Sequence, residues 1–310
     1  MGNAMYILET NDICKKYGQK YAVNKVNMHI EKGDIYGFVG ENGAGKTTII
    51  RLITGLVKPT SGSYSINGVD SNSKEIYNER KKLAAIVESV SIIGDCKPLD
   101  NLKYQRTITN TKKSDEELIA LINKVGLDYE AVKDKKVGNF SLGMRQRLGI
   151  AVAMVSSPEL IILDEPMNGL DPQGFIEIRE IIHKLSKEGV TFLISSHILS
   201  ELEKVCNKVG FISKGELLKE VTMKEIHQNS RKRIDIFVKN PEKVKDLLVK
   251  ELGIKDFKVK EDKVKVFDEV DINKLMKVLV DNKVEVSSFN VKQDTVEDYY
   301  INLLVRGENN

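Results

Sequence analysis

Residues 37–50 read GFVGENGAGKTTII, and this stretch decides the fold. Its glycine, lysine and threonine positions fit the spacing G-x-x-x-x-G-K-[ST]. An apolar run (residues 35–39) leads into it, and a helical pattern follows it. Glycines let a loop curl so that its N–H groups face phosphate oxygens, and a helix N-terminus adds partial positive charge. The stretch therefore predicts a strand–loop–helix phosphate site made by Asn42, Gly43, Ala44, Gly45, Lys46, Thr47 and Thr48.

The lysine and threonine of this stretch have distinct expected roles. Lys46 is expected to neutralise the β- and γ-phosphates of a bound nucleotide, and the hydroxyl of Thr47 to coordinate Mg²⁺. A glycine-rich turn that matches by chance would lack the strand before it and the helix after it. The sequence therefore predicts an α/β domain that binds a nucleoside triphosphate.

A second motif, LIILDEP (residues 160–166), places two carboxylates after an apolar run. In open α/β sheets, ligands bind at the carboxyl ends of the strands. Asp164 is expected to hold Mg²⁺, directly or through water, and Glu165 to polarise the attacking water. The alternative, a solvated turn, is the weaker interpretation beside a phosphate loop.

A third apolar run, FLISSH (residues 192–197), ends at His197. Its strand is expected to lie near the strand of the phosphate loop, so that the imidazole reaches the γ-phosphate and holds the attacking water. The other histidines, His29, His183 and His227, have no such setting, and we assign them structural roles.

Composition sets the limits of these interpretations. The chain has 310 residues, 41% of them hydrophobic and 30% charged, as in soluble globular proteins. Its 48 basic and 45 acidic residues leave a net charge of +3, which argues against a broad surface for nucleic acid. No run approaches the roughly 20 apolar residues that cross a bilayer, so direct membrane insertion is not expected. Three widely spaced cysteines suggest free thiols and a cytoplasmic location.

The character of the sequence changes near residues 226–232. We predict a nucleotide-binding domain over residues 5–225 and an accessory domain over residues 226–310. In the second part, runs such as RIDIFV and DFKVKEDKVKVF have strand patterns, and PEKVKDLLVKELG and DINKLMKVLVDN are amphipathic helices. This alternation predicts a small α+β domain. It is either a regulatory or dimer-stabilising module or a solvated extension of the core.

From Tyr6 to Leu218 these motifs together resemble the ATP-binding cassette (ABC) family, specifically the nucleotide-binding subunit of a transporter. The resemblance implies a RecA-like parallel sheet, an antiparallel β subdomain and an α-helical subdomain. In KKYGQKYAV, Tyr17 takes the position of the aromatic residue that stacks on adenine. In NGLDP, Asp171 falls in the loop that communicates across a dimer interface and contributes to nucleotide binding.

The family's signature motif, usually Leu-Ser-Gly-Gly-Gln, falls on FSLGMRQRLGIA (residues 140–151). The resemblance implies that Ser141 and Gly143 bind the γ-phosphate held by a second copy, in a head-to-tail dimer that sandwiches ATP. Ser141 also suits a helix N-cap. Leu142, Met144 and Arg145 depart from the pattern, and Arg145 is a candidate for a charge-assisted bond to phosphate.

Another departure narrows the resemblance. Glu88, in LAAIVESVSI, stands where the family usually has the Gln that senses Mg²⁺ and couples to the membrane partner. With the signature and DEPMNGLDP, it makes the chain similar to exporters of the bacitracin-resistance and lantibiotic-immunity type. The resemblance implies an ATPase that uses ATP and Mg²⁺, works with integral membrane permease subunits at the inner face of the membrane, and exports a peptide antibiotic or similar amphiphile.

Two other function classes fit the sequence less well. Soluble ABC ATPases that act on ribosomes resemble two cassettes in one chain, and those that act on DNA carry long coiled-coil insertions; this chain shows neither. A small-molecule kinase with a phosphate loop does not explain the signature, Asp171 or His197. The transporter ATPase is therefore the preferred hypothesis.

Overall fold

The computed structural model describes residues 6–230, 232–293 and 295–307. The chain divides into two compact units, one in the residues up to Met223 and the other from Lys224 onward. Met5, the predicted start of the nucleotide-binding domain, lies outside the described residues, as does Arg231 in the polar stretch after the boundary. Each unit has a hydrophobic core of its own.

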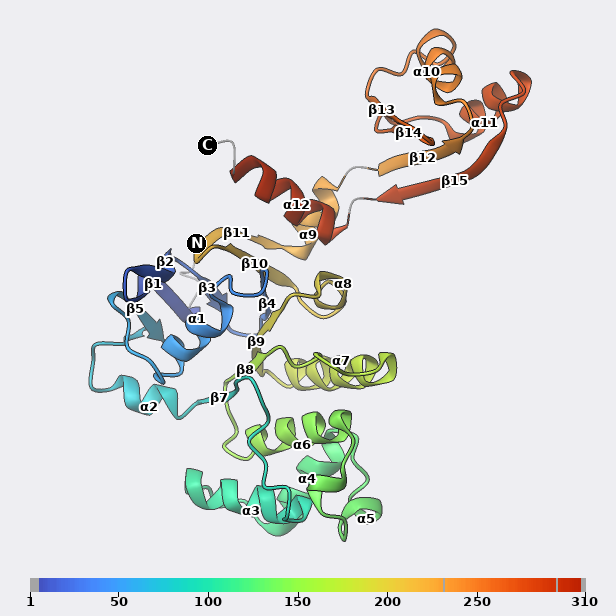
Figure 1. The fold of residues 1–310 in the computed structure, drawn as a ribbon. Helices are drawn as coiled ribbons and strands as arrows, with labels where there is room; N and C mark the ends of the chain where they lie inside the picture. Colours follow the sequence, from blue (N-terminus) through green and yellow to red (C-terminus); the bar gives the residue numbers. More distant parts are fainter. Residues whose placement is uncertain (1–5, 231, 294, 308–310) are drawn as a thin grey trace. The chain divides into compact units, whose positions relative to one another are not determined.

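A six-stranded sheet forms the centre of the first unit (Figure 1). All neighbours in it are parallel except the pair at one edge, which is antiparallel. Three of its inner strands are buried at every residue, as expected for strands covered on both faces. In spatial order the strands are β11 (Glu216–Thr222), β10 (Lys208–Ser213), β4 (Ile35–Val39), β9 (Thr191–Ser196), β8 (Leu160–Asp164) and β7 (Leu83–Ile86).

Helices connect the strands of this sheet and form a group beyond its β7 edge. Residues 74–155 are mainly helical, but they also contain β7, a short apolar run that pairs with β8. The helical group packs against β7 through α6. The helices of the unit are α1 (Lys46–Ile53), α2 (Ile76–Arg80), α3 (Pro98–Thr109), α4 (Asp115–Lys124), α5 (Tyr129–Val132), α6 (Leu142–Met154), α7 (Pro172–Lys187) and α8 (Leu199–Leu202).

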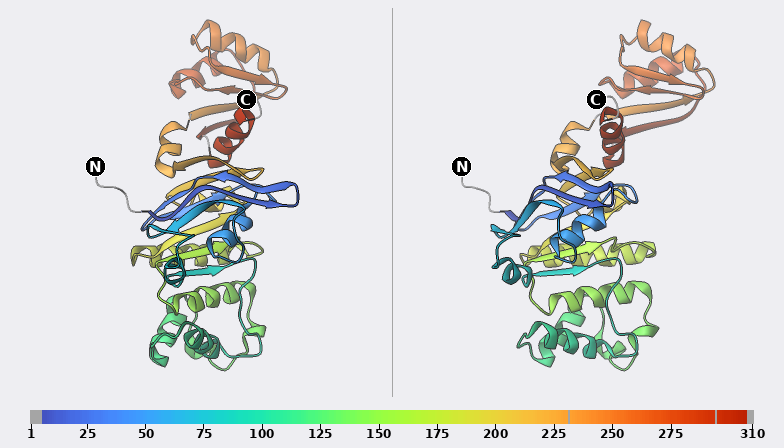
Figure 2. Two further views of the ribbon diagram at one scale, coloured as in Figure 1. Left: turned by 90° about the vertical axis from the view of Figure 1, so that its left-hand side faces the viewer. Right: turned by 60° about the vertical axis from the view of Figure 1, so that its left-hand side comes forward.

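An antiparallel sheet lies at the other edge, where β2 contacts β11 (Figure 2). It has the order β2-β1-β5-β6, with β3 also paired to β1. The parallel core, antiparallel sheet and helical group confirm the predicted cassette fold. The strands are β1 (Tyr6–Tyr17), β2 (Lys20–Val26), β3 (His29–Glu31), β5 (Ser61–Ile66) and β6 (Val69–Asp70).

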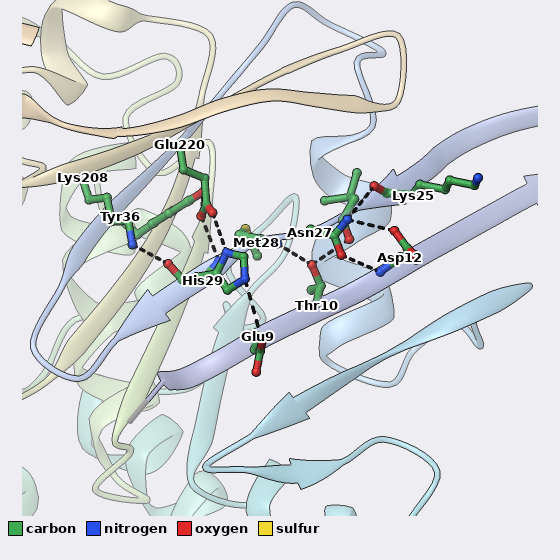
Figure 3. Close-up of polar contacts among 11 residues, drawn as sticks. Glu9, Thr10, Asp12, Lys25, Asn27, Met28, His29, Tyr36, Lys208 and Glu220 are labelled. Atoms are coloured by element: carbon green, nitrogen blue, oxygen red, sulfur yellow. Dashed lines mark hydrogen bonds and ion pairs between the residues drawn. The ribbon is translucent and has the colours of Figure 1, made fainter. Parts of the chain in front are cut away.

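A polar network joins the antiparallel sheet to the core sheet (Figure 3). Glu220 of β11 accepts hydrogen bonds from the backbone N–H of His29 (2.8 Å) and from the hydroxyl of Tyr36 on β4 (2.8 Å). Its other oxygen lies 2.7 Å from His29 Nδ1. Burial, together with the negative charge of Glu220, raises the pKa of Tyr36 well above its usual value. His29 thus has a structural role, as predicted.

Helix α9 (Met223–Asn229) begins at the last residue of the first unit, and the second unit contains a four-stranded antiparallel sheet of order β13-β14-β12-β15. Its β-α-β-β-α-β sequence of elements is the split βαβ arrangement, which agrees with the predicted α+β domain. The elements are β12 (Lys232–Val238), α10 (Pro241–Lys250), β13 (Phe257–Lys260), β14 (Lys263–Val266), α11 (Ile272–Asp281), β15 (Val286–Gln293) and α12 (Val296–Gly307). Among the described residues, no helix is long and apolar enough to cross a membrane.

Candidate functional site

The loop between β4 and α1 has the backbone that its glycines were expected to allow. Gly43 and Gly45 have φ of 81° and 111°, the left-handed region that favours glycine. A Cβ on Gly40 would lie 2.4 Å from the carbonyl oxygen of Ile212 on β10. Side chains are therefore excluded where the loop turns, and the backbone N–H groups of the α1 N-terminus stay available to an anion.

Lys46 is the buried cation of this loop, with 6% of its surface exposed. Its Nζ donates hydrogen bonds to the carbonyls of Gly40 (2.6 Å) and Glu41 (3.2 Å). The same atom lies 3.4 Å from Glu165 Oε1. The structure thus brings the lysine of one motif onto the carboxylate of another, more than a hundred residues away in the chain.

Asp164 is buried at the end of β8 and faces the start of α1. Its Oδ2 accepts a hydrogen bond from the hydroxyl of Thr47 at 2.9 Å, and its Oδ1 accepts one from the hydroxyl of Ser195. These are hard oxygen groups of the kind that Mg²⁺ prefers, and Mg²⁺ binding through few protein ligands plus phosphates is common. The Thr47–Asp164 pair therefore fits a magnesium ion.

Glu165 is held in a fixed orientation beside this pair. Its φ is 50°, and its N–H lies 3.1 Å from both the carbonyl and the hydroxyl oxygen of Ser195. Its Oε2 lies 2.9 Å from Nδ1 of His197, which follows β9. Because β9 pairs with β4 on one side and β8 on the other, the histidine strand lies where it was predicted, beside the phosphate-loop strand.

Ser141 is the N-cap of α6, and its hydroxyl accepts a hydrogen bond from the N–H of Met144 at 3.2 Å. Gly143 lies in the first turn, with only Leu170 (3.8 Å) near the position of a Cβ. This helix start is a polar, exposed N-terminus with a hydroxyl beside it, which suits an anion.

The arginines after Ser141 have partners within the chain. Arg145 Nη1 donates to the carbonyl of Phe140 at 2.6 Å, and Arg147 Nη1 donates to the carbonyl of Gly126 at 2.9 Å. Arg147 also lies 3.4 Å from Glu177. In this conformation Arg145 stabilises the turn before α6, so its guanidinium is engaged in the fold rather than presented to phosphate.

The other predicted site residues have contacts of their own. Asp171 is the N-cap of α7 and accepts from the N–H of Gly174 at 2.9 Å. Tyr17 ends β1 with its ring half exposed, and Lys15 Nζ lies 5.2 Å from the ring centroid. The Glu88 carboxylate lies 2.5 Å from Nη2 of Arg51 in α1, where it forms an ion pair with this side chain and not a contact with Thr47 or Asp164. Asn42 is exposed and Thr48 half-buried in the loop region.

Ser195 is the functional residue that the motifs did not identify. Its hydroxyl donates to the carboxylate of Asp164, and its carbonyl and hydroxyl oxygens accept from the backbone N–H of Glu165, so it fixes the Asp164 side chain and the Glu165 backbone. The available signal was its position two residues before His197, where side chains alternate along a strand. A serine inside a mostly apolar strand is a buried polar group, and such a group needs a hydrogen-bond partner.

Comparisons with known proteins agree with this geometry. The ABC transporter family matches residues 23–168. The bacitracin transport ATP-binding protein BcrA of Bacillus licheniformis is 40% identical over 97% of this chain and 98% of its own length. The lantibiotic transport ATP-binding protein SrtF of Streptococcus pyogenes is 42% identical over 69% of this chain and 90% of its own. The structure of cbiO1 from Clostridium perfringens covers 80% of this chain and 96% of its own, with a TM-score of 0.64 and 24% identity, and supports the fold.

The class of protein follows from the fold and these relatives. This chain belongs to the ABC transporter family, as its ATP-binding subunit. It binds ATP and hydrolyses it to power transport, as the family does.

Proposed function

We propose that this chain powers the export of a peptide antibiotic, or a similar amphiphile, through separate membrane permease subunits. The observation that carries the proposal is the 40% identity to a bacitracin transport ATP-binding protein over 98% of that protein's length. That relative aligns with the second unit as well as with the cassette, because the match spans 97% of this chain.

In the proposed reaction, the phosphate-loop residues from Asn42 to Thr48 hold the phosphates of ATP. Lys46 leaves its carbonyl partners for the β- and γ-phosphates, where its charge offsets theirs. Glu165 accepts the proton of the attacking water, and His197, 2.9 Å from it, orients that carboxylate and the water. Tyr17 stacks on the adenine ring, since its ring is half exposed at the end of β1.

Mg²⁺ is the proposed cofactor, held by Thr47 and Asp164 at the junction of α1 and β8. When bound, it would neutralise charge on the phosphate oxygens. Glu88 is the third proposed ligand. In this structure its Oε1 forms an ion pair with Nη2 of Arg51 at 2.5 Å, so the Glu88 loop has to change conformation before the carboxylate reaches the metal.

A second copy of the chain completes each ATP site in this proposal. Ser141 and Gly143 present a helix N-terminus, yet among the described residues no hydrogen bond joins them to the phosphate loop of their own chain. A head-to-tail dimer would place them against the γ-phosphate held by the other copy, with Asp171 at the same interface.

Replacing Ser141 by Ala tests the dimer. We expect hydrolysis to fall about tenfold or more in the assembled transporter, because a hydroxyl donor to a charged phosphate is lost. Ser186→Ala, on the far end of α7, is the matched control and should leave the rate unchanged. Normal hydrolysis by the Ser141 variant would mean that the site is not completed in trans.

The permease would dock beside the Glu88 loop. A hollow of about 580 Å³ opens there between β7, α3 and α6, and Tyr77 and Ile108 on its wall are 65% and 77% exposed. Exposed apolar side chains around a hollow are typical of a protein-binding surface. The cassette would thereby be peripheral at the inner face of the membrane.

Drug resistance tests the proposed export. The chain is co-expressed with its permease subunits in a bacitracin-sensitive host, and the inhibitory concentrations of bacitracin and of a lantibiotic are measured. We expect the native chain to raise at least one of them, Glu165→Gln to abolish the increase and the surface variant Glu188→Gln to keep it. No increase for any peptide antibiotic, with an active ATPase, would refute the proposed substrate class.

A further inference from the structure

The sheet of the second unit is covered on one face. Ile234 and Ile236 of β12 and Val264 and Val266 of β14 are buried in one cluster with α10 and α11. Successive side chains of a strand point to opposite faces, so the residues between them point away from these helices. The alternation KVKV in β14, half-buried and buried in turn, follows this rule.

Lysines gather on the face opposite the helices. Strand register places Lys258 directly opposite Lys265 and Lys260 directly opposite Lys263 on β13 and β14. Like charges that face each other across strands are destabilising. No described carboxylate forms an ion pair with any of the four. Burial, together with the positive charges of Arg233, Lys260 and Lys263, lowers the pKa of Lys265, and the negative charge of Asp235 only partly offsets this effect.

Protection of a sheet edge explains only half of this pattern. Lysines on an edge strand such as β13 commonly prevent pairing with other chains. Strand β14, however, is an interior strand, paired with β13 on one side and β12 on the other. Lys263 and Lys265 therefore have no edge to protect, and their crowding calls for another explanation.

An unsatisfied acceptor lies next to the lysines. Asp235 is opposite Lys265 on β12 and only 2% exposed. Its Oδ1 lies 3.4 Å from Nε of Arg233, but no described group donates a hydrogen bond to it. A buried carboxylate oxygen without a hydrogen-bond donor destabilises the fold. A ligand that brings an N–H group to this face would satisfy it.

Aromatic rings complete the face. Lys263 Nζ lies 4.8 Å from the ring centroid of Phe237, and Lys258 Nζ lies 6.0 Å from that of Phe267. Lys263 and Lys258 thus pack their ammonium groups near aromatic rings and are not surrounded by solvent alone. Ser288 and Asn290 of β15 lie opposite Phe237 and Asp235 and add hydrogen-bonding groups at the other end.

We propose that this lysine face, formed by Lys258, Lys260, Lys263 and Lys265, with Asp235 opposite Lys265, binds an acidic, extended polypeptide segment of a partner protein. Carboxylates of the segment would lie between the opposed lysines and relieve their repulsion, and a backbone N–H would donate to Asp235. A phospholipid surface or a phosphate backbone offers the negative charge without a regular row of N–H donors. The polypeptide is the ligand class that matches both features.

Fluorescence anisotropy with the full-length chain tests this proposal. The probe is a labelled peptide of five Glu-Ser repeats, and the same peptide with alternate backbone nitrogens methylated removes N–H donors without changing charge. A single variant combines Lys258→Gln, Lys260→Gln, Lys263→Gln and Lys265→Gln. The matched control combines Lys250→Gln, Lys274→Gln, Lys277→Gln and Lys283→Gln, all exposed lysines on or next to the helices of the opposite side.

We expect the first variant to bind the peptide about tenfold or more weakly than the native chain, and the control variant to bind it normally. The methylated peptide should bind several-fold more weakly than the parent. The first variant should remain folded, because its changes remove like-charge pairs; its thermal unfolding is measured alongside.

Four results would overturn the proposal. The first is no saturable binding of the peptide, and the second is equal loss of binding in both variants. The third is equal binding of the methylated peptide. The fourth is tighter lysine-dependent binding of oligouridylate or of phosphatidylglycerol vesicles. That last result would assign the face to a phosphate-bearing polyanion or to a membrane surface instead.

Discussion

The cassette and the second unit both combine strands with helices, yet they use their sheets in opposite ways. In the cassette, β4, β8 and β9 are buried along their whole length, and the polar groups Asp164, Glu165 and His197 come where the strands end. In the second unit, β14 alternates between Lys and Val, so its polar groups lie along a face. A parallel sheet covered on both sides can offer a ligand only its end, whereas an antiparallel sheet with one covered side can offer a surface.

This difference explains the kinds of ligand that the two units suit. At the strand ends, Lys46 lies within ion-pair distance of Glu165, and Ser195 hydrogen-bonds to both Asp164 and the Glu165 backbone, so the groups converge as site-specific chemistry requires. Across the lysine face, the ammonium groups are spread over β13 and β14 and do not converge on one point. The cassette is therefore built for catalysis on one phosphate, and the second unit for recognition of an extended chain.

The substitution with the largest expected effect is Glu165→Gln, which tests the catalytic site at the strand ends of the cassette. We expect ATP turnover to fall by about 100- to 10,000-fold, since a general base is lost, while ATP binding is kept. Turnover and nucleotide affinity are measured separately, by phosphate release and by equilibrium titration. Glu188→Gln, which removes a surface carboxylate paired with Lys124, should change neither. Full hydrolysis by the Glu165 variant would show that another group accepts the proton.

Core truncation tests whether the two sheets serve separate purposes. Ile236→Ala in the second unit and Ile162→Ala in the cassette each remove a fully buried side chain and should each lower the stability of their own unit by about 2–5 kcal/mol. Only the cassette variant should weaken ATP binding, because β8 carries Asp164 at its end. Denaturant unfolding and ATP titration are compared for the two. An equal loss of ATP affinity in both would contradict the division of roles.

The junction between the antiparallel and core sheets gives a smaller, pH-dependent effect. Tyr36→Phe removes a hydrogen bond to a charged acceptor and should cost about 1.5–3 kcal/mol at neutral pH. Folding raises the pKa of Tyr36 above that of the unfolded chain, so the stabilisation is complete below pH of about 10 and is lost as the pH rises beyond it.

The difference in unfolding free energy between the native chain and Tyr36→Phe should therefore shrink on going from pH 8 to pH 11. Tyr104→Phe is the control, because its ring is 53% exposed. A difference that stays constant over this range would mean that the Tyr36 hydroxyl has the same pKa in the folded and unfolded chains.

Much of the catalytic site at the strand ends of the cassette was predictable, because its motifs are local in the sequence. The glycines, Lys46 and Thr47 lie on one strand–loop–helix unit, and Asp164 and Glu165 are adjacent, so spacing alone relates them. Ser195 was not predicted, since its importance comes from strand pairing that places β9 beside β8. Arg145 was assigned a candidate role at phosphate, but its nearest acceptor is the carbonyl of Phe140 in the turn before its own helix.

The sequence by itself determined the class of fold, the phosphate loop and the identity of the acidic pair, because these depend on backbone conformation and hydrophobic periodicity over short stretches. Only the tertiary structure decided which side chains meet. It placed Lys46 against Glu165, turned Glu88 toward Arg51, and set Lys258 and Lys260 opposite the lysines of β14. The physical reason is that such contacts depend on sheet order and register, which join segments far apart in the chain.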